Sequence, residues 1–232
     1  MPLDGAILGE GIYIPRQAAR LLGATAQDVL RWTRGSGPVD PLWKAHYQFL
    51  DDTAEVSFQD LMDLRIVRAL RMAGISLQAV RYAIAFARER FGIEHPLSTA
   101  NFKTDGAGIL MDAVEKDSEL VSLSRKNAGQ KVFAKIVEQS VSGLEYKGSR
   151  VARWWPTRGK HVLIDPKRSF GDPVLDKSGV STGTLYKEFQ RHGDPKYLAK
   201  LYEIDLSGVK EALKFEDSLN HTSSKARDQG SV

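Results

Sequence analysis

The first clear periodicity in the chain is helical and covers residues 13–34. Pro15 suits the first turn of a helix, and the alanines and leucines after it form an apolar stripe at helical spacing. Gly23 interrupts the stripe, Thr25 can cap a second helix, and apolar residues recur as far as Trp32. A helix, a glycine turn and a capped second helix in this order predict a helix-turn-helix.

Two later segments repeat one helical pattern. Residues 75–86 align without gaps on residues 204–215, with Ile, Leu, Val, Ala and Phe identical at matching places. Ser76 and Asp205 each stand where a side-chain oxygen can accept hydrogen bonds from the free amides of a first turn. The repeat predicts two capped amphipathic helices, and convergence between two ordinary helices is the alternative.

Between these helical segments the pattern changes. Residues 35–56 begin with glycine, serine and proline and continue with alternating aromatic and polar residues, which is typical of a β-wing. Residues 56–90 return to helical spacing, with a break at Gly74. Pro96 ends this run, so no long heptad helix is expected to follow.

The middle of the chain combines strand-like segments with one helix. Asp105-Gly106 and Gly108, within the first strand-like segment, are suited to a hairpin turn. The helix is expected over residues 129–141. The segments with strand composition are residues 102–114, 119–124, 151–155 and 161–164. They predict a small sheet between two helical units.

These elements predict a mainly α protein with small β elements, of the α+β class. Its parts would be an N-terminal winged helix-turn-helix, a mixed basic linker with a central small sheet, a C-terminal three-helix domain similar to a helix-turn-helix, and a disordered tail without apolar periodicity. The expected boundaries of these four parts are 1–96, 97–162, 163–219 and 220–232.

A more specific motif runs through the first predicted helix pair. Its residues are Ala18-Ala19, Leu21-Leu22-Gly23, Thr25 and Val29-Leu30-Arg31-Trp32. In this motif the segment resembles the winged helix of the excisionase and MerR superfamily. The resemblance implies DNA binding by a winged helix-turn-helix with further helices after the wing. The stop at Pro96 departs from that family, so its coiled-coil dimer seam and its effector domain are not carried over.

A second motif is spread over residues 163–219. Its residues are Ile164-Asp165-Pro166, Gly171-Asp172-Pro173-Val174, and Val209, Ala212, Leu213 and Phe215. In this motif the segment resembles the domain of unknown function numbered four-three-three, a three-helix unit common in antitoxins. Lys177-Ser178-Gly179 replaces that family's Gly-Thr-Arg turn, so the role of its arginine is not carried over.

The composition is that of a soluble globular protein. The 232 residues are 42% hydrophobic and 27% charged, with no apolar run of membrane-spanning length and no signal-peptide pattern at the start. Cysteine is absent, which excludes disulfides and thiolate sites and agrees with a reducing cytosol. We therefore expect a cytoplasmic protein with no membrane partner.

Charge is distributed unevenly, although the net charge is only +4. Residues 1–96 contain equal numbers of acidic and basic residues. Residues 125–168 contain eleven basic and three acidic residues and carry a net charge of +8. Such a concentration favours an anionic partner, with nucleic acid first among the candidates. A solvated basic face that keeps the protein soluble is the alternative.

The sequence nominates no catalytic constellation. Residues 179–183 fit the G-x-S-x-G pattern of a hydrolase nucleophile, but the chain after them is too short for the parallel sheet that holds such a serine, and a helix cap is the simpler role. The histidines form no ligand pair at helical spacing. Two carboxylate pairs, Asp51-Asp52 and Glu216-Asp217, lie in polar stretches and are expected to be solvated. We expect no enzyme activity, no metal and no other cofactor.

The candidate DNA-binding residues lie on three predicted elements. On the second helix, Gln27 and Arg31 can make two-point contacts with base edges, while Asp28 can accept from cytosine or position Arg31. Polar residues of the wing would reach phosphates or the minor groove. Arg65 and Arg68, with Arg71 on the same helix face, would line phosphates or form a surface row paired with Asp60 and Asp63. The full set is Thr25, Gln27, Asp28, Arg31, Arg34, Lys44, His46, Gln48, Arg65 and Arg68.

Together, the pattern and the two resemblances predict an antitoxin of a type II toxin–antitoxin system. It would bind double-stranded DNA at its own promoter as a repressor and neutralise a toxin that the second resemblance implies is a PIN-type ribonuclease. Lys225 or Arg227 of the tail would reach carboxylates of that toxin, and a disordered tail without a role is the alternative. A homodimer or a hetero-oligomer with the toxin is expected. The alternatives are a stand-alone DNA-binding transcription regulator, and a helix-turn-helix that serves only folding or protein docking.

Overall fold

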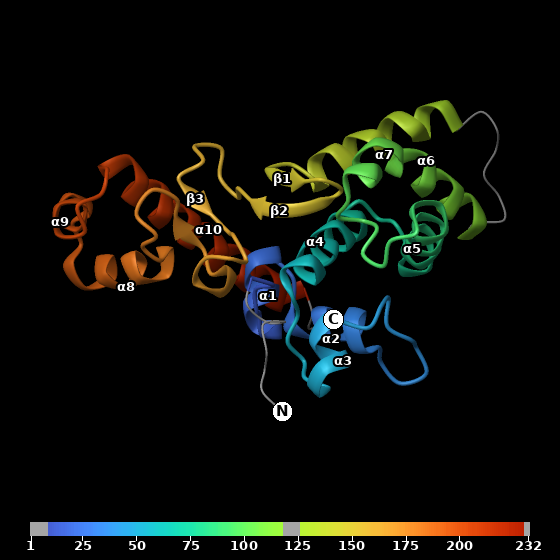
Figure 1. Cartoon of the computed structure of the whole chain (residues 1–232), viewed down its shortest axis with the longest axis horizontal. Coiled ribbons are helices and arrows are strands. Elements are labelled where there is room, and N and C mark those ends of the chain that lie inside the picture. The colour runs from blue at the N-terminus through green and yellow to red at the C-terminus, as the bar shows by residue number, and fades with distance from the viewer. Residues whose placement is uncertain (1–8, 118–125, 230–232) are drawn as a thin grey trace.

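The computed structural model describes residues 9–117 and 126–229. Its architecture is mainly helical, with two small two-stranded sheets, which confirms the coarse fold class. Figure 1 shows α1 to α4 in the middle, α5 to α7 on one side and α8 and α9 on the opposite side. Within these residues no helix has both the length and the apolar character needed to cross a membrane.

The predicted helix-turn-helix consists of α1 (Pro15–Leu22) and α2 (Ala26–Arg34). Gly23 ends α1 in the left-handed region with φ of 63°, where glycine avoids the strain that a Cβ would cause. Thr25 caps α2, because its side chain accepts a hydrogen bond from the amide of Asp28 at 3.0 Å. This local chemistry is what the sequence predicted, and both helices are confirmed.

The predicted β-wing is wrong. Residues 36 and 39 form only an isolated bridge at the turn after α2, and the next element is a short helix, α3 (His46–Asp51). Tyr47, on α3, is buried and donates its hydroxyl proton to the carbonyl of Gly11 at 2.7 Å. The alternation of aromatic and polar residues therefore reflects a helix held by a distant contact and not a strand.

The next two helices are confirmed. α4 (Phe58–Met72) and α5 (Leu77–Phe91) are separated by a turn at Gly74, as expected. Ser76 caps α5 by accepting from the amide of Ala79 at 2.9 Å. Figure 1 shows α4 in the centre of the molecule, between α1 and the α5–α7 side.

The strand predicted at residues 102–114 is wrong, because this segment lies in the helix α6 (Ala100–Asp117). Phe102, Ile109, Leu110 and Ala113 are all buried, at the spacing of one helix face. The strand predicted at 119–124 lies outside the described residues. α7 (Lys126–Ser140) confirms the helix expected over this part of the chain.

The predicted single sheet is replaced by two hairpins. β1 (Leu144–Lys147) pairs antiparallel with β2 (Arg150–Trp154), and β3 (Val162–Leu163) pairs antiparallel with β4 (Val174–Leu175). A single bridge between Trp154 and Ile164 connects them. The strands expected at 151–155 and 161–164 therefore exist, but each has its main partner elsewhere.

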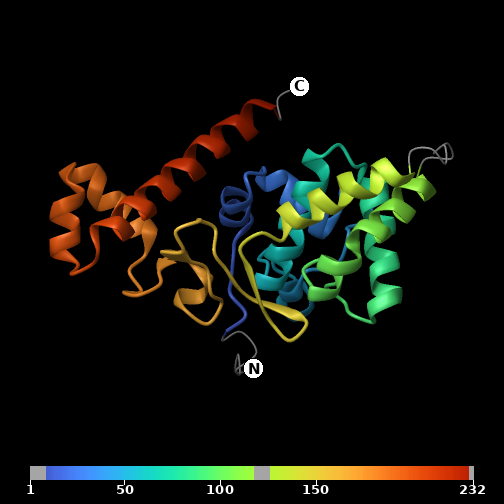
Figure 2. The ribbon, with the colours of Figure 1, turned by 90° about the horizontal axis from the view of Figure 1, so that it is seen from above.

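After a short 3-10 turn (Ser169–Gly171), the C-terminal part has the expected helices, α8 (Thr182–His192), α9 (Pro195–Leu201) and α10 (Leu206–Gln229). Ser181 caps α8 by accepting from Thr184, so the G-x-S-x-G segment is a helix cap. The disordered tail expected over 220–232 is wrong for residues 220–229, because α10 continues to Gln229, and residues 230–232 lie outside the described residues. Figure 2 shows α10 running from the α8–α9 end back over the middle of the molecule.

One large core serves most of the chain. Buried residues from Tyr13 through Trp32 and α4 continue without a break to Trp154 and Ile164. The C-terminal helices have two smaller clusters, in which Leu185, Ala212 and other apolar side chains are buried. The core is therefore continuous across the boundary expected at residue 96.

Candidate functional site

The exposed face of α2 carries the best-placed candidates. Gln27 and Arg31 are exposed, and the guanidinium of Arg31 pairs with Asp28 Oδ1 at 2.7 Å. The other oxygen, Asp28 Oδ2, accepts from the amide and the hydroxyl of Thr25 at 3.2 and 2.8 Å. Thr25 and Asp28 thus form the capping box at the N-terminus of α2, and Gln27 and Arg31 remain accessible to a ligand.

The next four candidates are Arg34, at the end of α2, and three residues of the segment that follows it. Arg34 bonds the carbonyls of Asp52 and Thr53 and the Asp52 carboxylate, the last at 3.0 Å. Lys44 is exposed and lies 4.7 Å from the ring centroid of Phe49. His46 and Gln48 are half-buried on α3. These residues lie beside α2 but do not form the wing that the sequence predicted.

Arg65 and Arg68 donate to backbone carbonyls within the chain and not to Asp60 or Asp63, which corrects the predicted surface row. Arg65 donates to the carbonyls of Ser140 and Ser142, and its guanidinium lies 5.0 Å from the ring centroid of Trp154. Burial lowers the pKa of the Arg65 guanidinium to about 10. Arg68 donates twice to the carbonyl of Gly23, at 2.8 and 3.1 Å. These arginines join α4 to α7 and to the turn of the helix-turn-helix.

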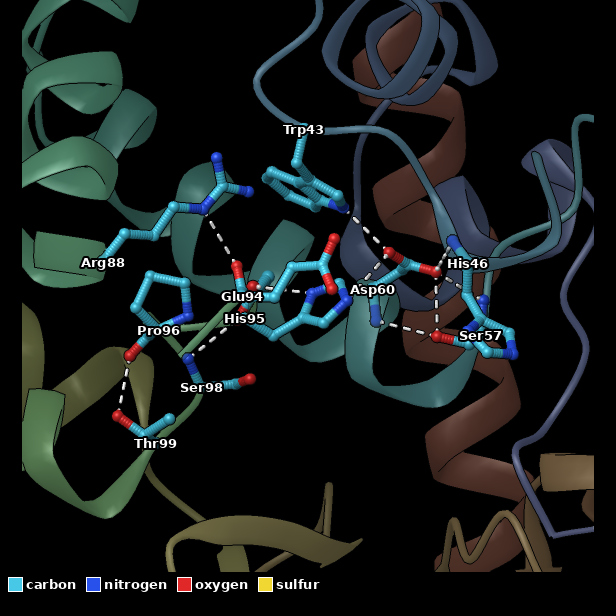
Figure 3. A network of polar contacts seen from close by, with 11 residues as sticks. Trp43, His46, Ser57, Asp60, Arg88, Glu94, His95, Pro96, Ser98 and Thr99 are labelled. Carbon is cyan, nitrogen blue, oxygen red and sulfur yellow. Dashed lines mark hydrogen bonds and ion pairs between the residues drawn. The ribbon is translucent and has the colours of Figure 1, made fainter. Parts of the chain in front are cut away.

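Asp60 organises a buried network that sequence reasoning missed (Figure 3). Its side chain has no exposed surface. One carboxylate oxygen accepts from Trp43 Nε1 at 2.8 Å, and the other accepts from the amides of His46 and Ser57 at 3.0 and 2.9 Å and from the Ser57 hydroxyl at 2.8 Å. Asp60 thereby fixes the segment before α3 on the start of α4.

His95 continues this network toward α6 (Figure 3). Its Nδ1 lies 3.2 Å from Asp63 Oδ2, and Asp63 Oδ1 accepts from the amide of Ser98 at 2.7 Å. Burial lowers the pKa of His95, but the hydrogen bond to Asp63 and the charges of Asp63, Asp60 and Glu94 outweigh burial, so the pKa is raised overall. Asp60 and Asp63 are thus buried, and neither pairs with the arginine row.

The raised pKa of His95 gives a pH dependence of stability. A group whose pKa is higher in the folded state than in the unfolded state stabilises the fold. This contribution to stability is complete below the unfolded pKa, which is 6.5 for His95, and it is lost as the pH rises through the folded pKa. The melting temperature of the natural protein should therefore fall as pH rises above 6.5. His95→Gln should flatten this part of the curve in thermal melts. Parallel curves for the two proteins would contradict the role of His95.

A second buried network joins the two ends of the chain. The carboxylate of Glu216, on α10, pairs with Arg20 of α1 at 2.5 Å and accepts from the Thr182 hydroxyl at the start of α8. Arg20 also donates to Asn220 at 2.9 Å. Glu216 is 3% exposed, so its expected solvation is wrong, whereas its neighbour Asp217 is exposed.

The remaining candidates are spread over the molecule. Lys225 and Arg227 have their backbone in α10, and their side chains lie outside the described part of the structure. Within the basic stretch, Arg153 pairs with Asp165 at 3.1 Å and Arg168 pairs with Asp176 at 2.8 Å. The positive charge of residues 125–168 is therefore balanced in part by internal ion pairs. Among the described side chains of this stretch, the exposed cations are Lys131, Lys135, Lys147, Arg150, Arg153, Arg158, Lys160 and Lys167.

The chain is similar to known proteins in sequence and in fold. No family model matches the chain. The chain is similar to a protein of Mycobacterium tuberculosis (strain ATCC 25618 / H37Rv) named "Putative antitoxin VapB45". The two are 26% identical over 170 residues, which make up 69% of this chain and 71% of that protein.

A solved structure shows the same fold. It is the X-ray crystal structure of Rv2018 from Mycobacterium tuberculosis, which matches with a TM-score of 0.69 and 23% sequence identity over 87% of this chain and 96% of that chain. At 23% identity this similarity shows the fold alone.

Proposed function

We propose that this protein is the antitoxin of a type II toxin–antitoxin system, which binds and neutralises a PIN-type ribonuclease and represses its own operon by binding DNA. The observation that carries the proposal is the similarity to VapB45 over 170 residues. The toxin class comes from the resemblance of residues 163–219 to an antitoxin-type domain. The three helices α8, α9 and α10 agree with the three-helix unit that this resemblance implies.

DNA binding is supported by the geometry of α1 and α2. A capped second helix with exposed Gln27 and Arg31 has the form of a recognition helix that enters the major groove. The ion pair with Asp28 holds the Arg31 guanidinium on the exposed side of the helix. An arginine fixed in this way can donate two hydrogen bonds to a guanine edge.

Co-purification tests the toxin part of the proposal. The protein encoded by the reading frame next to this gene is co-expressed with an affinity-tagged copy of this chain. We expect a stable complex in which the ribonuclease activity of the neighbour is lost. Operator binding by this chain, without a complex, would instead establish the stand-alone regulator.

Arg31→Ala tests the DNA part. If Arg31 contacts a base, its loss should weaken binding to the promoter by about 1–3 kcal/mol. Arg191→Ala is a matched control, because Arg191 is also exposed and also pairs with a carboxylate three residues earlier, Glu188, at 3.0 Å. Fluorescence anisotropy at moderate salt measures both variants. Equal affinities of the two variants would remove Arg31 from the interface.

A further inference from the structure

A groove of about 540 Å³ lies between the helix-turn-helix and α10. Its walls come from three parts of the chain that are far apart in sequence: the end of α1 with Gly23, residues 156–159 between β2 and β3, and one face of α10. Figure 2 shows how α10 passes over the middle of the molecule to make this arrangement. The groove therefore exists only when α10 is folded against the N-terminal helices.

The groove has walls that are fixed in place. A Cβ added to Gly159 would lie 1.8 Å from Glu211 Oε2, so residues 156–159 rest directly on α10. Glu211 accepts hydrogen bonds from the Thr157 hydroxyl and from the amide of His161, the latter at 3.0 Å. Because these bonds hold the wall before any ligand arrives, a ligand would lose little free energy in ordering it.

The floor of the groove is aliphatic. Leu21 and Leu22 are half-buried, and they face the groove together with the nearly buried ring of Phe215. The two aromatic rings that line it, those of Trp154 and Phe215, are only 7% and 6% exposed. Nucleic-acid bases bind by stacking on open aromatic faces, which these rings do not offer. An aliphatic side chain suits this floor better than a base.

The rim of the groove is positively charged. Arg158 and Lys214 are exposed, and neither makes an ion pair with any residue in the described part of the chain. The carboxylate of Glu211 is directed to Thr157 and His161, and that of Glu216 to Arg20. Two cations at the edge of an aliphatic floor are complementary to a segment that carries both carboxylates and an aliphatic side chain.

We propose that this groove binds an acidic segment of the toxin, with a leucine-type side chain on Leu21, Leu22 and Phe215 and carboxylates on Arg158 and Lys214. The proposal rests on the antitoxin function proposed above. Since α1 supplies one wall, the bound segment would contact the same helix-turn-helix that is proposed to bind DNA.

A charge-reversal pair tests this proposal. The double variant Arg158→Glu/Lys214→Glu should bind the purified protein from the adjacent reading frame at least about tenfold more weakly than the natural chain, measured by isothermal titration calorimetry. The control is Lys196→Glu/Lys200→Glu, which makes the same change in charge on two exposed lysines of α9. Circular dichroism and thermal melts establish that both variants fold.

The outcomes separate the two proposals. Equal toxin affinity of the two double variants would overturn the groove while leaving the antitoxin function in place. Failure of the natural chain to bind the neighbouring protein would overturn both. If the groove variant lost binding to single-stranded RNA but still bound the toxin, the ligand of the groove would be nucleic acid and not an acidic segment of the toxin.

Cross-linking gives a direct identification of the occupant. A photoreactive phenylalanine analogue replaces Ser218, which is exposed and lines the groove. A cross-linked toxin peptide that contains Asp or Glu beside an aliphatic residue is the expected result. A peptide without carboxylates would overturn the proposal.

Discussion

Replacing Asp60 with alanine should lower the free energy of unfolding by about 3–5 kcal/mol. The carboxylate is fully buried and is the shared acceptor for Trp43, His46 and Ser57. Alanine would leave these donors without an acceptor in an interior that water does not reach. The loss combines several unsatisfied groups with a weakened cap of α4, so it should exceed the cost of any one hydrogen bond.

Asp28→Ala is the matched control for Asp60→Ala. Asp28 has the same place in the capping box of α2 that Asp60 has in that of α4, but its side chain is 25% exposed. Its loss should cost about 1 kcal/mol, because water can replace the lost acceptor. Urea denaturation at neutral pH measures both. Equal losses for the two variants would show that the buried network adds nothing beyond an ordinary helix cap.

Glu216→Ala should have the second largest effect, a loss of about 2–3 kcal/mol. Glu216 is the buried acceptor for Arg20 and Thr182, and it joins α10 to α1 and α8. The Arg20 side chain is 36% exposed and can be hydrated once its partner is removed, so the loss should be smaller than for Asp60. Amides in this part of α10 should also exchange faster with solvent in the variant.

Glu188→Ala on α8 is the control for Glu216→Ala. Glu188 pairs with Arg191, whose side chain is 72% exposed, and such surface pairs contribute roughly 0–1 kcal/mol. Urea denaturation and hydrogen exchange compare the two variants. Two results would contradict this role of Glu216: equal stability of Glu216→Ala and Glu188→Ala, and unchanged amide exchange in α10. They would show that the contacts of Glu216 with Arg20 and Thr182 do not hold α10 in place.

The helix-turn-helix could be predicted because its signals are local. Gly23 ends one helix and Thr25 starts the next through contacts within a few residues, which a sequence displays directly. The repeat was informative for the same reason. Its identical valine and alanine are fully buried in both copies, as Val80 and Ala83 in α5 and as Val209 and Ala212 in α10.

The failures come from contacts between distant residues. In helix α3, aromatic and polar residues alternate as they do in a strand. Two hydrogen bonds hold this segment as a helix: Tyr47 donates its hydroxyl proton to the carbonyl of Gly11, and the amide of His46 donates to the Asp60 carboxylate. α6 contains glycine and strand-forming residues, but it packs between α5 and α7. In both segments, tertiary packing favours a helix although the local sequence favours a strand.

In the candidate site, too, features with local signals were predictable and features that depend on distant contacts were not. Gln27 and Arg31 follow from helix periodicity and are exposed as expected. Arg65 contacts Ser140, 75 positions away, and Glu216 contacts Arg20, 196 positions away, so no local pattern of the sequence indicates these roles. The groove beside α10 was beyond sequence reasoning, because its three walls come together only in the folded chain.

Growth rescue in living cells tests whether this chain neutralises a ribonuclease toxin. The protein from the adjacent reading frame is expressed from an inducible promoter, alone and with this chain, and viable cells are counted after induction. The neighbour alone should stop growth, and co-expression of this chain should restore it. Toxicity that persists at full strength despite equal expression of this chain would show that the chain does not neutralise its neighbour.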